Sequence, residues 1–134
     1  MAQRIVAPLP RPLAAFEAAQ VDAVALKAFF NLAGEWALTR DEQITLLGGP
    51  SVRTFYRWKA GDVSALPRDT LERISVLLGI YKALEILLPE PERAHAWVKR
   101  ANKAFGGATA LEVMLKGRVD DLYSVRRYLD AWRG

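Results

Sequence analysis

Residues 49–61, GPSVRTFYRWKAG, predict a short helix that carries its own start and stop signals. The hydroxyl of Ser51 can accept a backbone N–H of the first turn, as N-terminal caps do. Gly61 can adopt the left-handed backbone conformation that ends many helices. We therefore expect a separate helix between these two residues.

At about 100° per residue, the expected helix has one apolar face and one polar face. The apolar face holds Val52, Phe55 and Tyr56, with the aliphatic stem of Lys59 beside them. The polar face holds Arg53, Thr54 and Arg57. Arginine and threonine side chains suit the phosphates and base edges of nucleic acid. The apolar face would attach the helix to the protein and leave the polar face free to meet a partner.

A second short helix is predicted directly before this one. Thr39 and Glu42 have the spacing of a capping box, in which each side chain accepts the backbone N–H of the other residue. Apolar residues follow at 44, 46 and 47, and Gly48-Gly49-Pro50 breaks the helix. Two short helices joined by a glycine-containing turn, the second with a basic face, are typical of a helix-turn-helix. An ordinary helical hairpin with a solvated basic face is the alternative.

The composition limits the classes of protein to consider. The chain has 134 residues, which suits one domain or two small lobes, and its 51% of hydrophobic residues suffices for a core. The absence of cysteine excludes disulfides and thiolate metal sites, and the single His95 cannot form a histidine-based metal site alone. The net charge of +4 and the pI of about 9.6 favour an anionic partner only weakly, because a mildly basic protein need not bind nucleic acid.

The first residues, 1–12, contain three prolines and few polar anchors, so we expect a flexible N-terminal arm. They lack the long apolar core of a signal peptide. No run in the chain reaches the roughly 18 apolar residues that span a bilayer. A soluble, cytoplasmic protein is expected.

Two long stretches have helical apolar spacing. Residues 13–32 are alanine-rich and predict one or two helices with a wide apolar face, which belongs to the core or to a dimer seam. After Pro67, residues 69–88 predict a long helix that is apolar nearly all round in its later half and is therefore buried on several sides. Pro89-Glu90-Pro91 ends it. The expected segments are a flexible arm at 1–12, a helix-turn-helix domain at 13–88 and a C-terminal domain at 89–134.

The C-terminal residues predict three shorter helices, at 92–103, 109–116 and 119–132. The first two are joined by a tight turn at Phe105-Gly106-Gly107. No stretch of useful length alternates apolar and polar residues as a strand does. The fold class is therefore predicted to be all-α, with a helix-turn-helix lobe joined by a long central helix to a small helical C-terminal lobe.

The sequence offers no recognisable catalytic or cofactor motif. No glycine-rich loop precedes a Lys-Ser/Thr pair, and His95 has no nucleophile or metal-ligand partner at a recognisable spacing. Asp120 and Asp121 lie in the expected first turn of the last helix, where acidic residues favour the helix dipole. We therefore expect no enzyme, no metal site and no cofactor.

The residues of the second short helix are the first of a series of short motifs that continues to residue 134. Ser51-x-Arg53-Thr54-x-x-Arg57-Trp58-x-x-Gly61 is followed by Leu71-Glu72-Arg73-Ile74, Ala96-Trp97-Val98, Asn102, Phe105-Gly106-Gly107, Leu111-Glu112-x-Met114, Gly117, Val125-x-x-Tyr128-Leu129 and Gly134. In this order and spacing, the chain from about Leu38 onward resembles the antitoxins of the Xre/MbcA/ParS family. Ala101 and Thr109-Ala110 depart from the family pattern, which often has Pro before the asparagine and Ser-Pro before the Leu-Glu step.

The resemblance implies an all-helical antitoxin of a type II toxin–antitoxin system. Its C-terminal domain would bind and block a RES-type toxin, which consumes NAD or modifies proteins with it. Its helix-turn-helix would bind the promoter of the operon and repress it. The implied partners are the toxin, double-stranded promoter DNA and a second copy of the chain in a homodimer or a larger complex. NAD would be the substrate of the toxin and not a cofactor of this chain.

The candidate DNA-binding residues lie in and around the second short helix. Arg53 and Arg57, one turn apart, would enter the major groove and meet guanine or phosphate. The others would contact phosphates or a thymine methyl group, and they are Ser51, Thr54, Lys59 and Arg68. Trp58, at the rim of the apolar face, is expected to pack rather than to contact DNA.

The candidate toxin-binding residues combine landmarks of the family with the aromatic and arginine side chains that protein interfaces favour. They are Trp97, Asn102, Phe105, Tyr123, Arg126, Tyr128, Trp132, Arg133 and Gly134. The alternative is that Tyr128, Leu129 and Trp132 only complete the core.

Two other functions stay open on sequence alone. The chain can be a helix-turn-helix transcriptional regulator without a toxin partner, or a structural adaptor whose basic helix contacts protein rather than DNA. A steep fall in the affinity for duplex DNA with rising salt argues against the adaptor.

Overall fold

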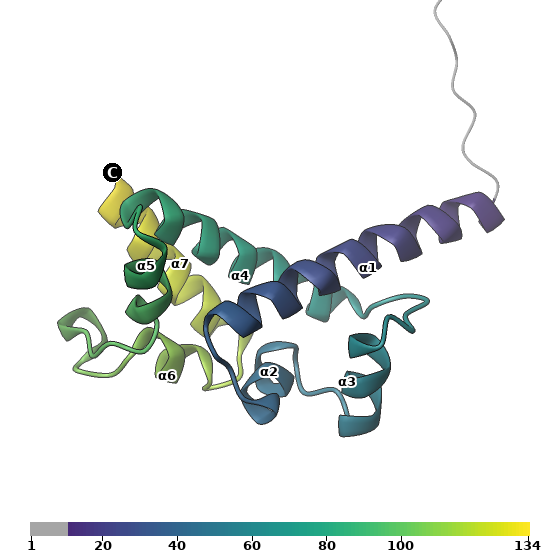
Figure 1. The fold of residues 1–134 in the computed structure, drawn as a ribbon, viewed down its shortest axis with the longest axis horizontal. Coiled ribbons are helices and arrows are strands. Elements are labelled where there is room, and N and C mark those ends of the chain that lie inside the picture. Colours follow the sequence, from purple (N-terminus) through teal and green to yellow (C-terminus); the bar gives the residue numbers. More distant parts are fainter. Residues whose placement is uncertain (1–10) are drawn as a thin grey trace, which may run out of the picture.

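The protein is all-α over residues 11–134, the part of the chain that the computed structural model describes (Figure 1). Its elements are α1 (Arg11–Glu35), α2 (Arg40–Leu46), α3 (Val52–Lys59), α4 (Arg68–Leu87), α5 (Pro91–Trp97), the 3₁₀ turn η1 (Lys103–Phe105), α6 (Ala110–Met114) and α7 (Val119–Arg133). The predicted fold class is confirmed. The predicted arm, residues 1–12, lies outside the described residues except for Arg11 and Pro12, which belong to α1.

Helix α4 is the central element of the fold. Figure 1 shows α1 crossing α4, and the most extensive contact between any two helices joins α4 to α7. Ile74, Leu77 and Ile80 are fully buried, as expected for a helix that is covered on several sides. Pro67 stands just before the first residue of α4, where its missing N–H leaves no helical hydrogen bond unmade.

Helix α1 is one continuous helix, and one side of its C-terminal half enters the core. Phe29 and Leu32 are buried on this side, and so is Trp36, which directly follows the helix. In Figure 1 the N-terminal half projects beyond the other helices, and Val21 and Val24 are 64% and 68% exposed there. Only the C-terminal half of α1 therefore packs against the core.

Two long-range hydrogen bonds tie the loops of the N-terminal half to distant helices. Ala37, between α1 and α2, has a φ of +51°, which residues other than glycine seldom adopt. The ammonium group of Lys99, just after α5, donates to the carbonyl of Ala37 over 2.9 Å. The backbone N–H of Leu66 donates to the carboxylate of Asp22 in α1 over 2.8 Å. The first bond joins the two halves of the chain, and the second fixes the loop before α4.

The C-terminal half contains shorter helices than the sequence predicts. Helix α5 ends at Trp97, so the prediction of a helix as far as residue 103 is wrong. The chain turns after Trp97, and Asn102, whose side chain accepts the backbone N–H of Ala104, starts the separate η1. Thr109 and Glu112 form the capping box that begins α6. The Gly106-Gly107 pair has φ values of +66° and +91°, so the predicted tight turn is confirmed.

Helix α7 begins with an ion pair that closes its first turn. The backbone N–H of Arg118 donates to the carboxylate of Asp121 over 3.1 Å, and the guanidinium lies 3.3 Å from the same group. The Arg118 side chain holds the pKa of Asp121 below its ordinary value, against the opposing effect of burial. Asp121 thus has the role at the helix start that the sequence predicts for it.

Candidate nucleic-acid interface and partner-binding surface

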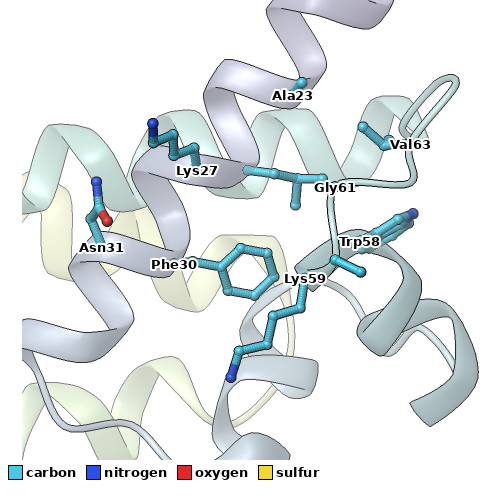
Figure 2. A pocket seen from close by; sticks show the side chains of 10 residues that line it. Ala23, Lys27, Phe30, Asn31, Trp58, Lys59, Gly61 and Val63 are labelled. Atoms are coloured by element: carbon cyan, nitrogen blue, oxygen red, sulfur yellow. The ribbon is translucent and has the colours of Figure 1, made fainter.

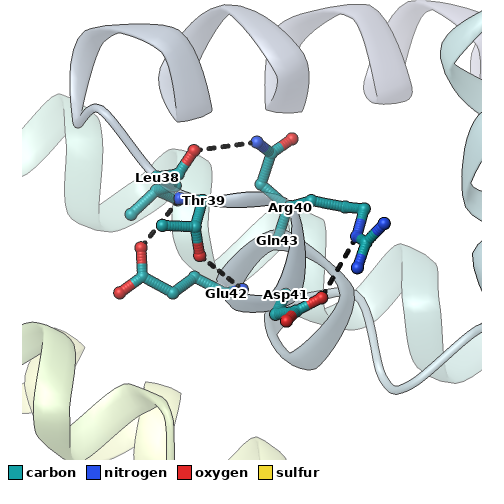
Figure 3. Close-up of polar contacts among 6 residues, drawn as sticks. All are labelled: Leu38, Thr39, Arg40, Asp41, Glu42 and Gln43. Carbon is teal, nitrogen blue, oxygen red and sulfur yellow. Dashed lines mark hydrogen bonds and ion pairs between the residues drawn. The ribbon is translucent and has the colours of Figure 1, made fainter.

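The first helix of the predicted helix-turn-helix starts with the capping box expected from its sequence. The backbone N–H of Glu42 donates to the Thr39 hydroxyl over 3.1 Å, and the N–H of Thr39 donates to the Glu42 carboxylate over 2.8 Å (Figure 3). The amide of the buried Gln43 donates to the carbonyl of Leu38 over 3.0 Å. These bonds fix the entry of the chain into α2.

The turn between α2 and α3 is docked on the first turns of α4. The hydroxyl of Thr70 donates to the carbonyl of Leu47 over 3.0 Å. Gly48 has a φ of +100°, and a Cβ at this position would lie 2.8 Å from the Asp69 carboxylate, so the turn favours glycine. The carboxylate of Asp69 is held in turn by Nε of the buried Arg73 over 2.8 Å. These contacts set the position of α3 relative to α4.

Helix α3 has the start and the end that the sequence predicts. The hydroxyl oxygen of Ser51 accepts the backbone N–H of Thr54 over 3.1 Å, and the two hydroxyl groups lie 3.0 Å apart. Gly61 follows the helix with a φ of +89°. The Ser51 hydroxyl is therefore engaged in the cap, and a phosphate contact by Ser51 would have to share it.

The buried face of α3 differs from the prediction. Phe55 and Trp58 are 1% and 6% exposed, whereas Val52 and Tyr56 are 45% and 50% exposed. The ring of Phe55 meets Phe30 of α1 edge-on, with 5.7 Å between the ring centroids. The placement of Val52 and Tyr56 on the buried face is wrong, because the helix is turned so that the large indole of Trp58 enters the core beside Phe55. The expectation that Trp58 packs is confirmed.

Four basic side chains are exposed on α3 and at the start of α2. Arg53, Arg57 and Lys59 are exposed on this helix, and Arg40 joins them from the first turn of α2. Hydrogen bonds to the Tyr56 hydroxyl of α3 and to Asp41 raise the pKa of Arg40 above its ordinary value. We call these four cations the α3 surface. Arg40 is not among the DNA-binding residues predicted from the sequence, although its place directly after the Thr39 cap puts it at the exposed start of α2.

Three cations of the α3 surface have local partners, and for Arg40 the nearest is the Asp41 carboxylate, 3.1 Å from its Nε. Nε of Arg57 lies 3.5 Å from the Asp62 carboxylate, and Nζ of Lys59 lies 5.9 Å from the centroid of the Phe55 ring. Exposed ion pairs contribute only about 0–1 kcal/mol, so a phosphate can replace these partners. Arg68, the remaining cationic candidate, is exposed at the start of α4 and does not belong to α3.

The C-terminal half carries a cluster of four aromatic rings. Trp97 stacks on Tyr128 with 6.1 Å between the centroids, and the centroid of Phe105 lies 5.2 Å from that of Tyr128. Trp132 lies 6.5 Å from Trp97 and is 45% exposed, whereas Trp97 is 8% exposed. We call these four rings the aromatic cluster. Trp97 anchors it in the core, and Trp132 presents an indole to the outside.

Two of the other candidates on α7 face α4. The hydroxyl of Tyr123 donates to the carboxylate of Glu72 over 2.8 Å, which raises the pKa of Tyr123 above its ordinary value. The guanidinium of Arg126 lies against Gly79, where an added Cβ would be 2.6 Å from Cζ of the arginine. Both side chains therefore help to hold α7 on α4, and only their outer edges can meet a partner.

The remaining toxin-binding candidates are close in sequence to residues of the aromatic cluster. Arg133 and Gly134 follow Trp132 and are exposed at the C-terminal end. Asn102 is half-buried as the cap of η1, which ends at Phe105. The structure therefore places some of the predicted partner-binding residues at the surface and others in supporting positions.

One small cluster of titratable groups joins α1, α4 and α5. Nε2 of the half-buried His95 lies 3.4 Å from the Glu35 carboxylate, and its ring stacks on Tyr81. A hydrogen bond to Glu35, helped by burial, raises the pKa of Tyr81 to about 12.

Across the described side chains, no group of three or more histidine or acidic residues is arranged to hold a metal ion. None of the described helices combines the length and the apolar character needed to cross a bilayer.

Comparison with known proteins assigns both halves of the chain. Residues 15–79 match the antitoxin Xre-like helix-turn-helix domain, and residues 83–134 match the antitoxin Xre/MbcA/ParS C-terminal toxin-binding domain. The chain is also 53% identical over 109 residues to the uncharacterized protein y4oB of Sinorhizobium fredii (strain NBRC 101917 / NGR234), which covers 81% of this chain and 84% of the relative. Both family matches reach into α4, where the first ends at 79 and the second begins at 83.

Proposed function

The chain belongs to the Xre/MbcA/ParS family of type II antitoxins, and we propose that it blocks a RES-type, NAD-consuming toxin and represses its own operon as a homodimer. The family supplies a DNA-binding domain and a toxin-binding domain, neither of which is known as an enzyme. The observation that carries the proposal is the separation of two surfaces. Helix α3 lies in the first domain, and α5 and α7, which carry three of the four rings of the aromatic cluster, lie in the second; Figure 1 shows α3 at the right and α5 and α7 at the left.

The α3 surface supports the proposed repression. Arg53 and Arg57 would enter the major groove and contact guanine or phosphate, while Arg40, Lys59 and Arg68 would contact the backbone. One copy of a short helix reads too few base pairs for a specific operator. We therefore propose that two copies bind a palindromic site in the promoter.

The aromatic cluster supports the proposed blocking of the toxin. An exposed indole such as that of Trp132, next to Arg133, has the composition of the residues that dominate protein–protein interfaces. The buried Trp97 and the half-buried Tyr128 beside it would keep the indole in one position. In this proposal NAD is the substrate of the toxin, and the antitoxin stops its consumption by occupying the toxin.

A helix-turn-helix regulator without a toxin is the second candidate function. The match of residues 83–134 to a toxin-binding domain weighs against it, because a plain regulator needs no such domain. The two functions differ in what the neighbouring gene encodes and in whether its product binds this chain.

Co-expression with the product of the neighbouring gene tests the proposal. We expect that product alone to arrest growth and to lower cellular NAD, and we expect this chain to restore both and to co-purify with it. A toxic neighbour that binds the chain without changing cellular NAD would exclude the NAD-consuming class of toxin. A neighbour that neither harms the cell nor binds the chain would favour the plain regulator.

A further inference from the structure

A cavity of about 470 Å³ opens between α1 and the residues at and beyond the end of α3 (Figure 2). Its walls are largely apolar and include Leu26, Phe30, Trp58 and Val63. In Figure 2 the ring of Phe30 points from α1 toward the end of α3, and the side chain of Lys59 runs past it. Cavities of about 300–1,000 Å³ with mainly apolar walls and a few polar groups are typical of sites for small organic molecules.

The charged residues that line this cavity are both cations. Lys27 of α1 and Lys59 of α3 are exposed at its edge, and no acidic side chain is among the described residues that line it. The amide of Asn31 adds one uncharged polar group. Two ammonium groups beside an apolar, partly aromatic wall complement a molecule with an apolar body and a negative end.

We propose that this cavity binds a small amphipathic organic acid. Its aromatic or aliphatic body would lie against Phe30 and Trp58, and its anionic group would be held by Lys59. Figure 2 shows the ammonium group of Lys27 on the other side of Phe30, so Lys27 would add a longer-range attraction. The site differs from the proposed DNA and toxin surfaces in its apolar walls, and it shares only Lys59 with the α3 surface.

Because Lys59 belongs to both sites, binding of the acid would affect DNA binding. This inference rests on the promoter binding proposed above. A bound anion neutralises Lys59, which then contributes less to the contact of the α3 surface with phosphates. Removing one phosphate contact lowers the slope of log affinity against log salt by about 0.9. The acid would therefore weaken promoter binding and make it less dependent on salt.

Titration of the full chain with anilinonaphthalene sulfonate, an aromatic anion that fluoresces in apolar sites, tests the binding. We expect one site per chain by calorimetry and displacement of the probe by decanoate. Lys59→Gln should weaken the binding by roughly two- to fivefold, as for an exposed charge pair, and Lys27→Gln should weaken it less. Ala23→Phe, which fills the cavity from an exposed position on α1, should abolish it.

Val24→Phe is the matched control, since Val24 is exposed on the same helix and does not line the cavity. The control should bind the probe as the wild type does, and circular dichroism should show both phenylalanine variants folded. Probe binding that survives Ala23→Phe, or a wild-type chain that binds no probe because a second copy covers the cavity, would overturn the proposal.

The DNA measurement separates this proposal from the proposed repression. With decanoate bound, the affinity of the wild type for promoter DNA should fall, while that of Ala23→Phe should not change. If the chain binds the probe at this site but has no affinity for its promoter, the proposed repression is refuted. The organic-acid site is then still supported.

Discussion

Arg126 of α7 occupies the space over Gly79 of α4 in which another residue would place its side chain. A Cβ at position 79 would lie 2.6 Å from Cζ of Arg126, and Nε of the same guanidinium lies 3.3 Å from the Asp130 carboxylate. A glycine inside a helix costs about 1 kcal/mol relative to alanine. This glycine lets the arginine lie flat between the two helices that share the most extensive contact of the fold.

Gly79→Ala should displace Arg126 without unfolding the protein. The gain in helix propensity, about 1 kcal/mol, should be largely offset because the guanidinium has to move. In an Arg126→Ala background the same substitution should stabilise the protein by nearly the full amount. Urea denaturation of the four proteins in this double-mutant cycle measures the difference. An equal gain in both backgrounds would show that the two residues do not interact.

Arg53→Ala combined with Arg57→Ala should abolish promoter binding and leave the fold intact. Each good arginine contact to guanine contributes about 1–3 kcal/mol, so the two together should lower the affinity by roughly 30-fold or more. Electrophoretic mobility shift at fixed salt measures this loss. Arg93→Ala with Arg100→Ala removes the same charge from exposed positions in the other half of the chain and serves as the control. Unchanged affinity in the first pair would exclude α3 as the recognition helix.

Two substitutions at Ser51 separate its capping role from a contact with DNA. Ser51→Ala should lower the free energy of unfolding by about 1 kcal/mol, because the N–H of Thr54 loses its acceptor. Ser51→Asp should keep the cap and the stability, since aspartate caps equally well, but its negative charge should repel phosphates. Thermal unfolding and DNA titration of both variants test this. An aspartate variant as unstable as the alanine variant would contradict the capping role.

Trp132→Ala should destroy toxin binding with little loss of stability, because Trp132 is 45% exposed. Trp97→Ala should instead destabilise the protein by about 3–5 kcal/mol, as truncations of buried aromatic residues do. Co-purification with the toxin, growth rescue and thermal unfolding distinguish the two effects. Deleting the last helical turns is a poorer test, because it also removes the buried Leu129. Full neutralisation by the Trp132 variant would remove this indole from the interface.

The ion pair between Arg118 and Asp121 should make the stability fall in acid. The folded pKa of Asp121 lies below the ordinary value of 3.8, so the carboxylate stabilises the fold fully above that value. The contribution is lost as the pH falls through the lower folded pKa. Asp121→Asn should therefore be less stable than the wild type at neutral pH, by about 1 kcal/mol for a partly exposed pair. Denaturation series at several pH values should show this difference shrinking below pH 3.8, and a constant difference would contradict the linkage.

The parts of the fold that sequence predicts well are those set by neighbouring residues. The Thr39 and Ser51 caps and the Gly61 stop depend on contacts within a few positions, and the structure has each of them. The face of α3 was predicted only in part, because the burial of Trp58 instead of Tyr56 depends on Phe30 and the space beside α1.

Contacts between distant residues were beyond the reach of sequence reasoning. Nothing in the chain near Gly79 points to Arg126, and nothing near Ala37 points to Lys99. The end of α5 was misplaced for a related reason, since Asn102 starts η1 within a loop that is closed by pairing between Ala101 and Thr109. The sequence therefore predicts which residues belong to the candidate sites. It does not predict which contacts hold each of the two surfaces in place.

The continuity of α4 through both family matches bears on how such antitoxins can evolve. The first match ends and the second begins inside this helix, at 79 and 83, with Ile80 buried between them. No flexible linker therefore separates the two matched domains. A recombination event that exchanges the toxin-binding domain would have to cross over within a helix. A viable chimera has to inherit α7 together with the part of α4 that α7 contacts, which includes Glu72 and Gly79. The heritable unit of toxin specificity is thus larger than the toxin-binding domain alone, and it includes part of the helix that carries the DNA-binding domain.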